Sequence, residues 1–317
     1  MTKTETPTAV GGTIAHADDE RRAGFLDAVM ARIAGCFRRC EPRRLVRDFV
    51  LGLLMELEDH NCWTLGEALG HTGPHRLQHL LSRAKWDERQ VLDETAAWAA
   101  GHLTDLDDSG HAGGDAVFIV DETGDAKSST DCVGAARQYS GSLGGVALCQ
   151  VTVNLTLATA RGHTIIDRRL YLPGDWAADE ERRELAGVPD EVEFATKSQL
   201  AATMLAHACH RGIGAACVAG DEVYGGRDLR RTVRSLGMGY VMAVKHDHTV
   251  TLGPRTTTAR KAVRLIGDGG WQRMRTGTGT KGVRSYDWAM LAINPDDTPE
   301  GDQAGDQAGD QAGDQAG

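Results

Sequence analysis

Hydrophobic and polar positions follow a helical period in the first third of the chain. In residues 42–59, PRRLVRDFVLGLLMELED, apolar side chains recur every three or four positions, which predicts an amphipathic helix with one buried face. Two shorter helical patterns follow, WTLGEALG at 63–70 and HRLQHLLSRAKW at 75–86, and the sequence HTGP separates them. This spacing predicts a helix-turn-helix-like pair within a small all-α domain. Simple helix packing without DNA contact is the alternative for such a pair.

From about residue 114 the pattern becomes typical of strands. The apolar run VFIV (117–120) ends at Asp121, and VALCQVTVNLTLAT (146–159) alternates as a strand does. Strands and helices then alternate, with a helix predicted at 198–211, a strand at 215–220, a helix at 227–237 and a strand at 240–244. We therefore expect an α/β fold with a mixed sheet and flanking helices.

These patterns divide the chain into segments of different character. We expect a disordered N-terminus (1–20), a helical DNA-binding domain (21–103), an α/β core (114–244), the start of a β-rich insertion (245–293) and a disordered acidic tail (294–317) that repeats GDQA four times. No apolar run approaches the roughly 18 residues that span a bilayer. The seven cysteines form no CxxC pair, and this pattern predicts reduced thiols in the protein core. We expect a cytoplasmic protein without a membrane partner.

Charge is distributed unevenly along a chain whose formal net charge is −10. Residues 226–284 carry 13 Lys and Arg against 3 Asp and Glu, whereas residues 294–317 carry 7 acidic side chains and no basic one. A basic segment of this kind suits the phosphates of nucleic acid, although a solvated helix face is the alternative for the arginines at 227–234. The predicted DNA contacts are Arg76, Arg83 and Lys85 in the helix pair, and Arg227, Arg230, Arg231, Arg234, Lys245, Lys261 and Arg264 in the basic segment.

Two aspartates are placed where the sheet of an α/β protein holds its ligand groups. Asp121 and Asp221 each follow an apolar strand-like run directly. If the two strands are neighbours, the carboxylates meet and suit a pair of Mg²⁺ ions that promote phosphodiester chemistry. A turn or N-cap role is the alternative for each aspartate. A phosphatase with an aspartate nucleophile is disfavoured, because Thr123 stands where such enzymes usually have a second Asp.

Several long stretches carry a further indication of function. They include NCWTLGEALGHTGPHRLQHLLSRAKWD (61–87), FIVDETGDAKSSTDCVGAARQYSGSLGGVALCQVTVNL (118–155) and AGDEVYGG (219–226). Over about residues 40–290 the chain resembles the DDE transposases of bacterial insertion sequences, which are DDE superfamily endonucleases with an RNase H-like fold. The resemblance implies that Asp121 and Asp221 are the first two catalytic carboxylates and bind Mg²⁺ or Mn²⁺. It also implies DNA partners, namely element ends and target, a homodimer on that DNA, and association with the nucleoid.

The sequence departs from the family at two positions. The first motif is more often Asp-Asp-Thr-Gly, whereas Glu122 follows Asp121 in this chain. The third carboxylate of the family is a Glu on a helix after the β-rich insertion, and the one Glu after Glu222 is Glu300, which lies next to Pro299 before the repeats. The third carboxylate is therefore unknown, and the chain resembles a transposase that is C-terminally truncated, with an incomplete RNase H-like catalytic core.

This leaves three functional hypotheses open. The first is an insertion-sequence transposase that cleaves DNA at element ends and transfers the strand, with cleavage impaired by the loss of the third carboxylate. The second is a non-catalytic DNA-binding remnant that competes for element ends. The third is a misfolded product without a function, which would show no cooperative unfolding transition.

Overall fold

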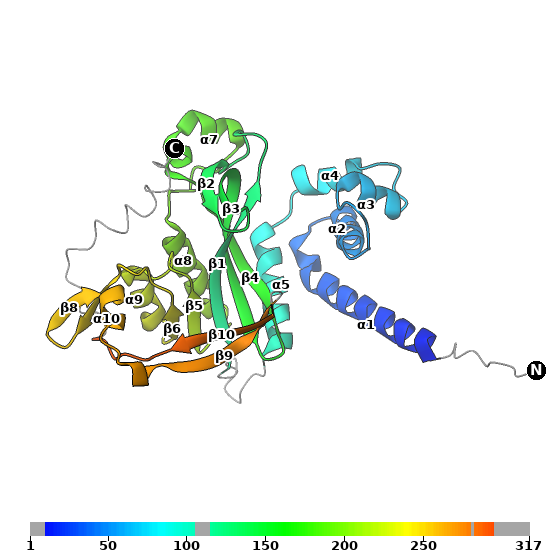
Figure 1. The fold of residues 1–317 in the computed structure, drawn as a ribbon. Helices are drawn as coiled ribbons and strands as arrows, with labels where there is room; N and C mark the ends of the chain where they lie inside the picture. Colours follow the sequence, from blue (N-terminus) through cyan, green and yellow to red (C-terminus); the bar gives the residue numbers. More distant parts are fainter. Residues whose placement is uncertain (1–9, 105–114, 280–281, 295–317) are drawn as a thin grey trace, which may run out of the picture. The chain divides into compact units, whose positions relative to one another are not determined.

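The chain forms two compact units, Met1–Asp105 and Leu106–Gly317, in a computed structural model that describes residues 10–104, 115–279 and 282–294. The first unit runs from blue to cyan in Figure 1 and the second from green to red. The acidic, glycine-containing stretch around 105–114 and the GDQA tail lie outside the described residues. The disorder expected for the tail therefore stays a prediction.

The first unit contains helices throughout its described residues. They are α1 (Val10–Ile33), the 3₁₀ turn η1 (Ala34–Cys36), α2 (Cys40–Leu53), α3 (Cys62–Ala68), α4 (His75–Ser82) and α5 (Glu88–Leu103). Residues 10–20, which we expected to be disordered, belong to α1 and correct that boundary. Residues 13–33 contain no proline and many strong helix formers. The helix can therefore extend toward the N-terminus as far as Val10.

The short helices α3 and α4 form the predicted pair and pack on α2 through one apolar cluster. Leu45, Leu65, Leu77 and Leu80 are its buried members. Asn61 begins α3 with a capping box, in which its side chain accepts hydrogen bonds from the backbone of Trp63 and Thr64 and the Thr64 hydroxyl accepts one from the Asn61 backbone. The polar side of α4 remains exposed.

The second unit is built on a mixed six-stranded sheet. Its strands are β1 (Val117–Ala126), β2 (Ala136–Ser140), β3 (Gly145–Thr159), β4 (Gly162–Leu170), β5 (Cys217–Gly220) and β6 (Gly239–Met242). They lie in the order β2-β3-β1-β5-β6, and β4 also pairs with β3. Strand β1 is antiparallel to β3 and parallel to β5, and β5 is parallel to β6. The expected mixed sheet is confirmed.

Helices flank the sheet, as expected for this fold class. They are α6 (Gly174–Ala178), α7 (Glu180–Ala186), α8 (Lys197–His210) and α9 (Arg227–Ser235). Helix α8 packs on β3, β4 and α9, and Figure 1 shows α8 and α9 close to each other. Alternate residues of β1 and β3, such as Phe118, Val120 and Leu155, are buried because successive side chains of a strand point to opposite faces. These alternate residues form the core of the unit.

Two hairpins follow the sheet in the segment that we expected to be β-rich. The elements are β7 (Thr249–Leu252), β8 (Arg255–Thr258), α10 (Ala259–Val263), the 3₁₀ turn η2 (Asp268–Gly270), β9 (Gln272–Gly279) and β10 (Gly282–Trp288). β7 pairs with β8, and β9 pairs with β10. In the part of the chain that the structure describes, no helix is long and apolar enough to cross a membrane.

The seven cysteines lie in the described residues, and all are free thiols. Cys36 and Cys149 are buried, as the sequence predicted. Cys40 is exposed, which corrects the expectation that all of the thiols lie in a core. Its position explains the difference, because it is the first residue of α2 and precedes the buried face of that helix.

Candidate functional site

The sheet brings Asp121 and Asp221 to adjacent strands. In the parallel pairing of β1 with β5, Val120 lies opposite Gly220, so the residues that follow them are the two aspartates. Both aspartates are exposed. The neighbouring strands that the sequence analysis required are therefore present, and the two carboxylates lie at the same edge of the parallel pair.

Strand β1 extends further than its hydrophobic pattern indicated. We expected the strand to end at Asp121, but it continues to Ala126, and Asp121 pairs with Asn154 of β3. The extension follows from the length of β3, whose residues 149–158 pair with the whole of β1. Asp121 is therefore held within a paired strand, which fixes its backbone more firmly than a strand end would.

Asp221 begins the tight turn after β5. Its Oδ1 atom accepts a hydrogen bond from the backbone N–H of Val223 at 2.9 Å, and its carbonyl accepts one from the N–H of Tyr224 at 3.2 Å. Glycines border the turn: a Cβ atom at Gly220 would lie 3.1 Å from the Tyr224 Cβ, and one at Gly225 would lie 2.7 Å from the Ala243 carbonyl oxygen. The turn therefore has no room for larger residues at these positions.

Three other carboxylates surround Asp221 at this turn. Although Asp221 is exposed as a residue, partial burial of its carboxyl group raises its pKa above the usual value, the Val223 N–H opposes that shift, and the negative charges of Glu122, Asp121 and Glu222 raise it further. A concentration of negative charge on adjacent strands is destabilising unless a cation or a proton compensates it. A cation bound near Asp221 would offset this negative charge.

Glu122 has structural partners that the sequence analysis did not identify. Its carboxylate accepts a hydrogen bond from the Tyr224 hydroxyl at 2.7 Å and pairs with the Lys197 ammonium at 3.2 Å. Tyr224 is fully buried, and burial followed by the charge of Glu122 raises the pKa of its hydroxyl well above the usual value, so it stays a donor. Strand alternation could have shown that Glu122 shares the buried face of Phe118 and Val120.

The donor set of Asp121 and Asp221 fits Mg²⁺ or Mn²⁺. Both side chains offer hard oxygen ligands, both are exposed, and Mg²⁺ keeps several of its waters when few protein ligands are present. Among the residues that the structure describes, no group of three or more His, Cys, Asp and Glu side chains is arranged to hold a metal ion. Asp121 and Asp221 thus offer two carboxylates to a metal ion, and within the described ranges no third carboxylate is arranged with them to bind it.

The predicted DNA contacts of the helical unit are accessible. Arg76 lies on α4, Arg83 lies directly after it, and Lys85 follows in the connection to α5. All three side chains are exposed, and none has an ion-pair partner within the described part of the chain.

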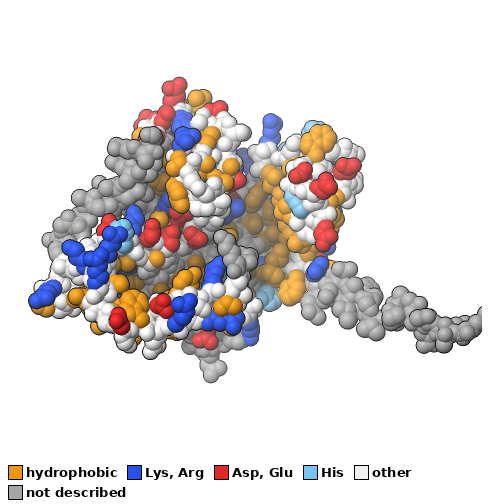
Figure 2. Space-filling view, in the orientation of Figure 1, with side chains coloured by type: hydrophobic (Ala, Val, Ile, Leu, Met, Phe, Trp, Pro, Cys, Tyr) orange, Lys and Arg blue, Asp and Glu red, His pale blue; other side chains and the backbone are white. Residues whose placement is uncertain are grey.

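The predicted contacts in the basic segment differ in their exposure. Arg231 and Arg234 on α9 are exposed, but Arg231 pairs with Asp228 at 2.9 Å and Arg234 contacts the Tyr240 hydroxyl at 3.4 Å. The remaining members are two half-buried arginines of α9, Arg227 and Arg230, and three exposed side chains, Lys245, Lys261 and Arg264. Figure 2 shows Lys and Arg side chains over the region of α9, α10 and β8, with Asp and Glu side chains beside them.

Comparison with known proteins identifies the class to which this fold and site belong. The profile of the DDE superfamily endonucleases matches residues 32–288, which include most of both units. The chain therefore belongs to the DDE superfamily endonuclease family, and its mixed sheet with flanking helices is RNase H-like, as the resemblance implied.

A curated relative agrees with this assignment. The chain is 23% identical, over 209 residues, to a protein of Microchaete diplosiphon described as a probable transposase for insertion sequence element IS701. The matched region is 65% of this chain and 50% of the relative. The chain thus spans about half the length of the curated relative that it matches. The predicted family, the DDE superfamily endonucleases, is confirmed by the profile match.

Proposed function

We propose that this protein is an insertion-sequence transposase that binds DNA at element ends and carries the metal-dependent site for DNA cleavage and strand transfer. The observation that carries the proposal is the pairing of β1 with β5, which puts Asp121 next to Asp221 in a member of the DDE endonuclease family. The transposase relative supports the same function.

In this proposal, Asp121 and Asp221 are the metal ligands and supply no nucleophile. Bound Mg²⁺ or Mn²⁺ would activate water or a 3′ hydroxyl and stabilise the leaving oxygen of the phosphodiester. The hydrogen bond from Val223 orients the Asp221 carboxylate, and the pairing of Asp121 with Asn154 of β3 fixes the Asp121 backbone. Lys197 and Tyr224 hold Glu122 on the neighbouring position of β1.

The basic side chains supply DNA affinity in the same proposal. The exposed members Arg231, Arg234, Lys245, Lys261 and Arg264 would contact backbone phosphates, and the affinity would fall steeply as salt concentration rises. The working form would be a homodimer on paired DNA ends, located at the nucleoid.

We further propose that these 317 residues cleave DNA weakly by themselves. The reason is that two carboxylates hold a pair of cations less firmly than three, and Glu300 is the one Glu in the sequence after Glu222. This observation also favours the second candidate function, a DNA-binding protein that occupies element ends and competes with an active transposase.

The test combines a binding measurement with a nicking measurement on the full chain. We expect salt-dependent binding to duplex DNA by fluorescence anisotropy, together with little nicking of supercoiled plasmid in Mg²⁺ or Mn²⁺. Efficient metal-dependent nicking that disappears in Asp121→Ala would contradict the impairment and leave the assignment of Asp121 intact. If the chain does not bind DNA at any salt concentration, the proposed function is wrong.

A further inference from the structure

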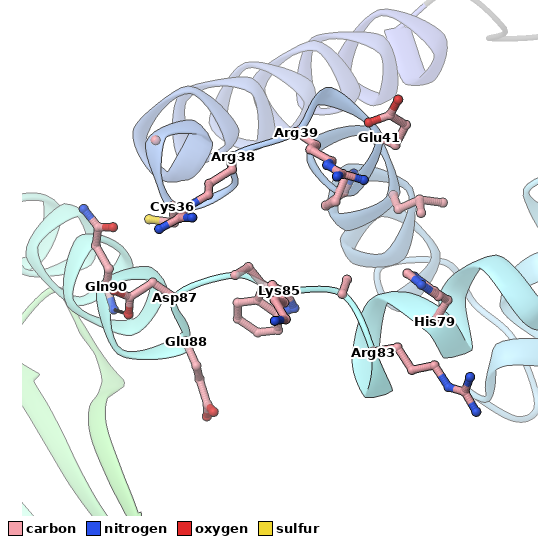
Figure 3. Close-up of a pocket in the computed structure, with 15 residues that line it drawn as sticks. Cys36, Arg38, Arg39, Glu41, His79, Arg83, Lys85, Asp87, Glu88 and Gln90 are labelled. Carbon is pink, nitrogen blue, oxygen red and sulfur yellow. Dashed lines mark hydrogen bonds between the residues drawn. The ribbon is translucent and has the colours of Figure 1, made fainter.

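A hollow of about 1070 Å³ lies in the helical unit, between the η1–α2 connection and the α4–α5 connection (Figure 3). Arg38 and Arg39 line it from the first connection, and Arg83 and Lys85 line it from the second. Each of its two walls therefore carries two cationic side chains. All of the lining residues belong to the first unit.

The two walls are held together by contacts that involve none of these cations. The backbone N–H of Asp87 donates to the carbonyl of Cys36 at 3.4 Å. The rings of Phe37 and Trp86 lie 5.6 Å apart, and the indole N–H of Trp86 donates to the Leu80 carbonyl at 3.1 Å. The hollow is therefore part of the packed helical unit.

The four cations are available to a ligand. Arg38, Arg39, Arg83 and Lys85 are exposed, and in the described residues none of their side chains donates a hydrogen bond or forms an ion pair within 4 Å. By contrast, Arg32 and Arg47 of the same unit are paired with Glu94 and Asp27 at 2.7 and 2.9 Å. The hollow thus gathers four cationic side chains that form no ion pair within the described residues.

Acidic side chains also line the hollow, but they leave its cations unpaired. Asp87 caps α5, because its carboxylate accepts a hydrogen bond from the Gln90 backbone at 2.8 Å. In Figure 3 the Glu88 side chain extends away from Lys85 and Arg38. Glu41 lies at the first turn of α2, where its own backbone N–H is the main cause of its lowered pKa and the charges of Arg39 and Arg44 make smaller contributions. Asp87 and Glu41 thus interact mainly with backbone N–H groups at the first turns of α5 and α2.

A second hollow of about 700 Å³ lies against α4. His75, Gln78 and Ser82 line this second hollow, whereas His79 and Arg83 line both hollows. The exposed side of α4 is therefore a ridge between two hollows. A helix that enters the major groove of DNA lies between two phosphate backbones, so a hollow on each side of α4 would match the positions of those backbones.

We propose that the first hollow is a contact site for one phosphate backbone of duplex DNA, bound by Arg38, Arg39 and Lys85 while the exposed side of α4 faces the groove. The inference rests on the proposed DNA-binding function and adds to it the place and residues of the contact. The guanidinium and ammonium groups donate hydrogen bonds to phosphate oxygens and bring no sequence preference of their own.

The test measures duplex binding by the full chain as a function of salt concentration. The variants are Arg38→Ala, Arg39→Ala, Lys85→Ala and the triple substitution, and Arg22→Ala on α1 is the matched control. Arg22 is exposed and has no ion-pair partner in the described part of the chain. The unfolding midpoint of each variant verifies that the fold is retained.

Each lost phosphate contact should reduce the magnitude of the slope of log K against log salt by about 0.9. We therefore expect each single variant to bind about fivefold more weakly at 0.1 M salt, and the triple variant to lose between two and three units of slope. Arg22→Ala should match wild type.

If wild type binds DNA and the triple variant binds it equally well with the same slope, the hollow is not a contact site for the DNA backbone, although the proposed function stands. If wild type binds no duplex, both proposals are overturned.

Discussion

Replacing Trp176 with alanine is expected to lower the free energy of unfolding of the α/β unit by about 3 to 5 kcal/mol, which is the usual cost of removing a buried tryptophan. Trp176 has no exposed surface, and its indole N–H donates to the Ala135 carbonyl at 2.9 Å. The Arg182 guanidinium covers its ring at 3.7 Å from the centroid. The substitution would leave a cavity and a buried carbonyl without its donor.

Thermal unfolding measured by circular dichroism tests this expectation. The midpoint should fall by about 10 °C in Trp176→Ala. Trp288→Ala is the matched control, because the Trp288 side chain is 50% exposed on the β9–β10 hairpin and its removal should change the midpoint little. Equal midpoints for the two variants would show that Trp176 does not hold the unit together.

Replacing Lys197 with methionine is expected to destabilise the same unit by about 1 to 3 kcal/mol, because it leaves the Glu122 carboxylate without its ammonium partner. The two side chains are only 15% and 19% exposed. Since little water reaches them, solvent cannot fully replace the lost pair. The Tyr224 hydroxyl remains bonded to Glu122 and limits the loss.

A double-mutant cycle separates the pair from its surroundings. Urea unfolding of Lys197→Met, Glu122→Gln and the double variant gives the coupling energy between the two side chains. We expect the double variant to lose less unfolding free energy than the two single variants lose together, because it leaves no charge unpaired. Strict additivity would mean that Lys197 and Glu122 do not interact in solution.

The sequence pattern was sufficient to locate the two aspartates, but it did not show how they are held. Asp121 and Asp221 were found because each follows an apolar run, a feature that depends on neighbouring residues alone. The continuation of β1 to Ala126 depends on pairing with β3, and the partners of Glu122 are 75 and 102 residues away in sequence. Long-range contacts of this kind leave no local pattern.

The basic residues illustrate the same distinction on the surface. Charge counting found the segment that contains Arg231 and Arg234, but the burial of neighbouring Arg227 and Arg230 depends on how α9 packs on α8 and β6. Arg38 and Arg39 were not singled out from the sequence, since they lie in a short connection without a motif. Their proximity to Lys85 arises only when the two connections fold against each other.

Binding of Mn²⁺ to the full chain, measured by calorimetry and by the loss of the free-ion electron paramagnetic resonance signal, tests the central claim most directly. The readout is independent of cleavage, so it applies even if these residues cleave DNA weakly. Asp121→Asn and Asp221→Asn keep the size of each side chain and remove its charge. The account predicts that wild type binds Mn²⁺ and that each substitution weakens binding by about tenfold or more. Wild-type affinity in both variants, or no binding by wild type, would contradict it.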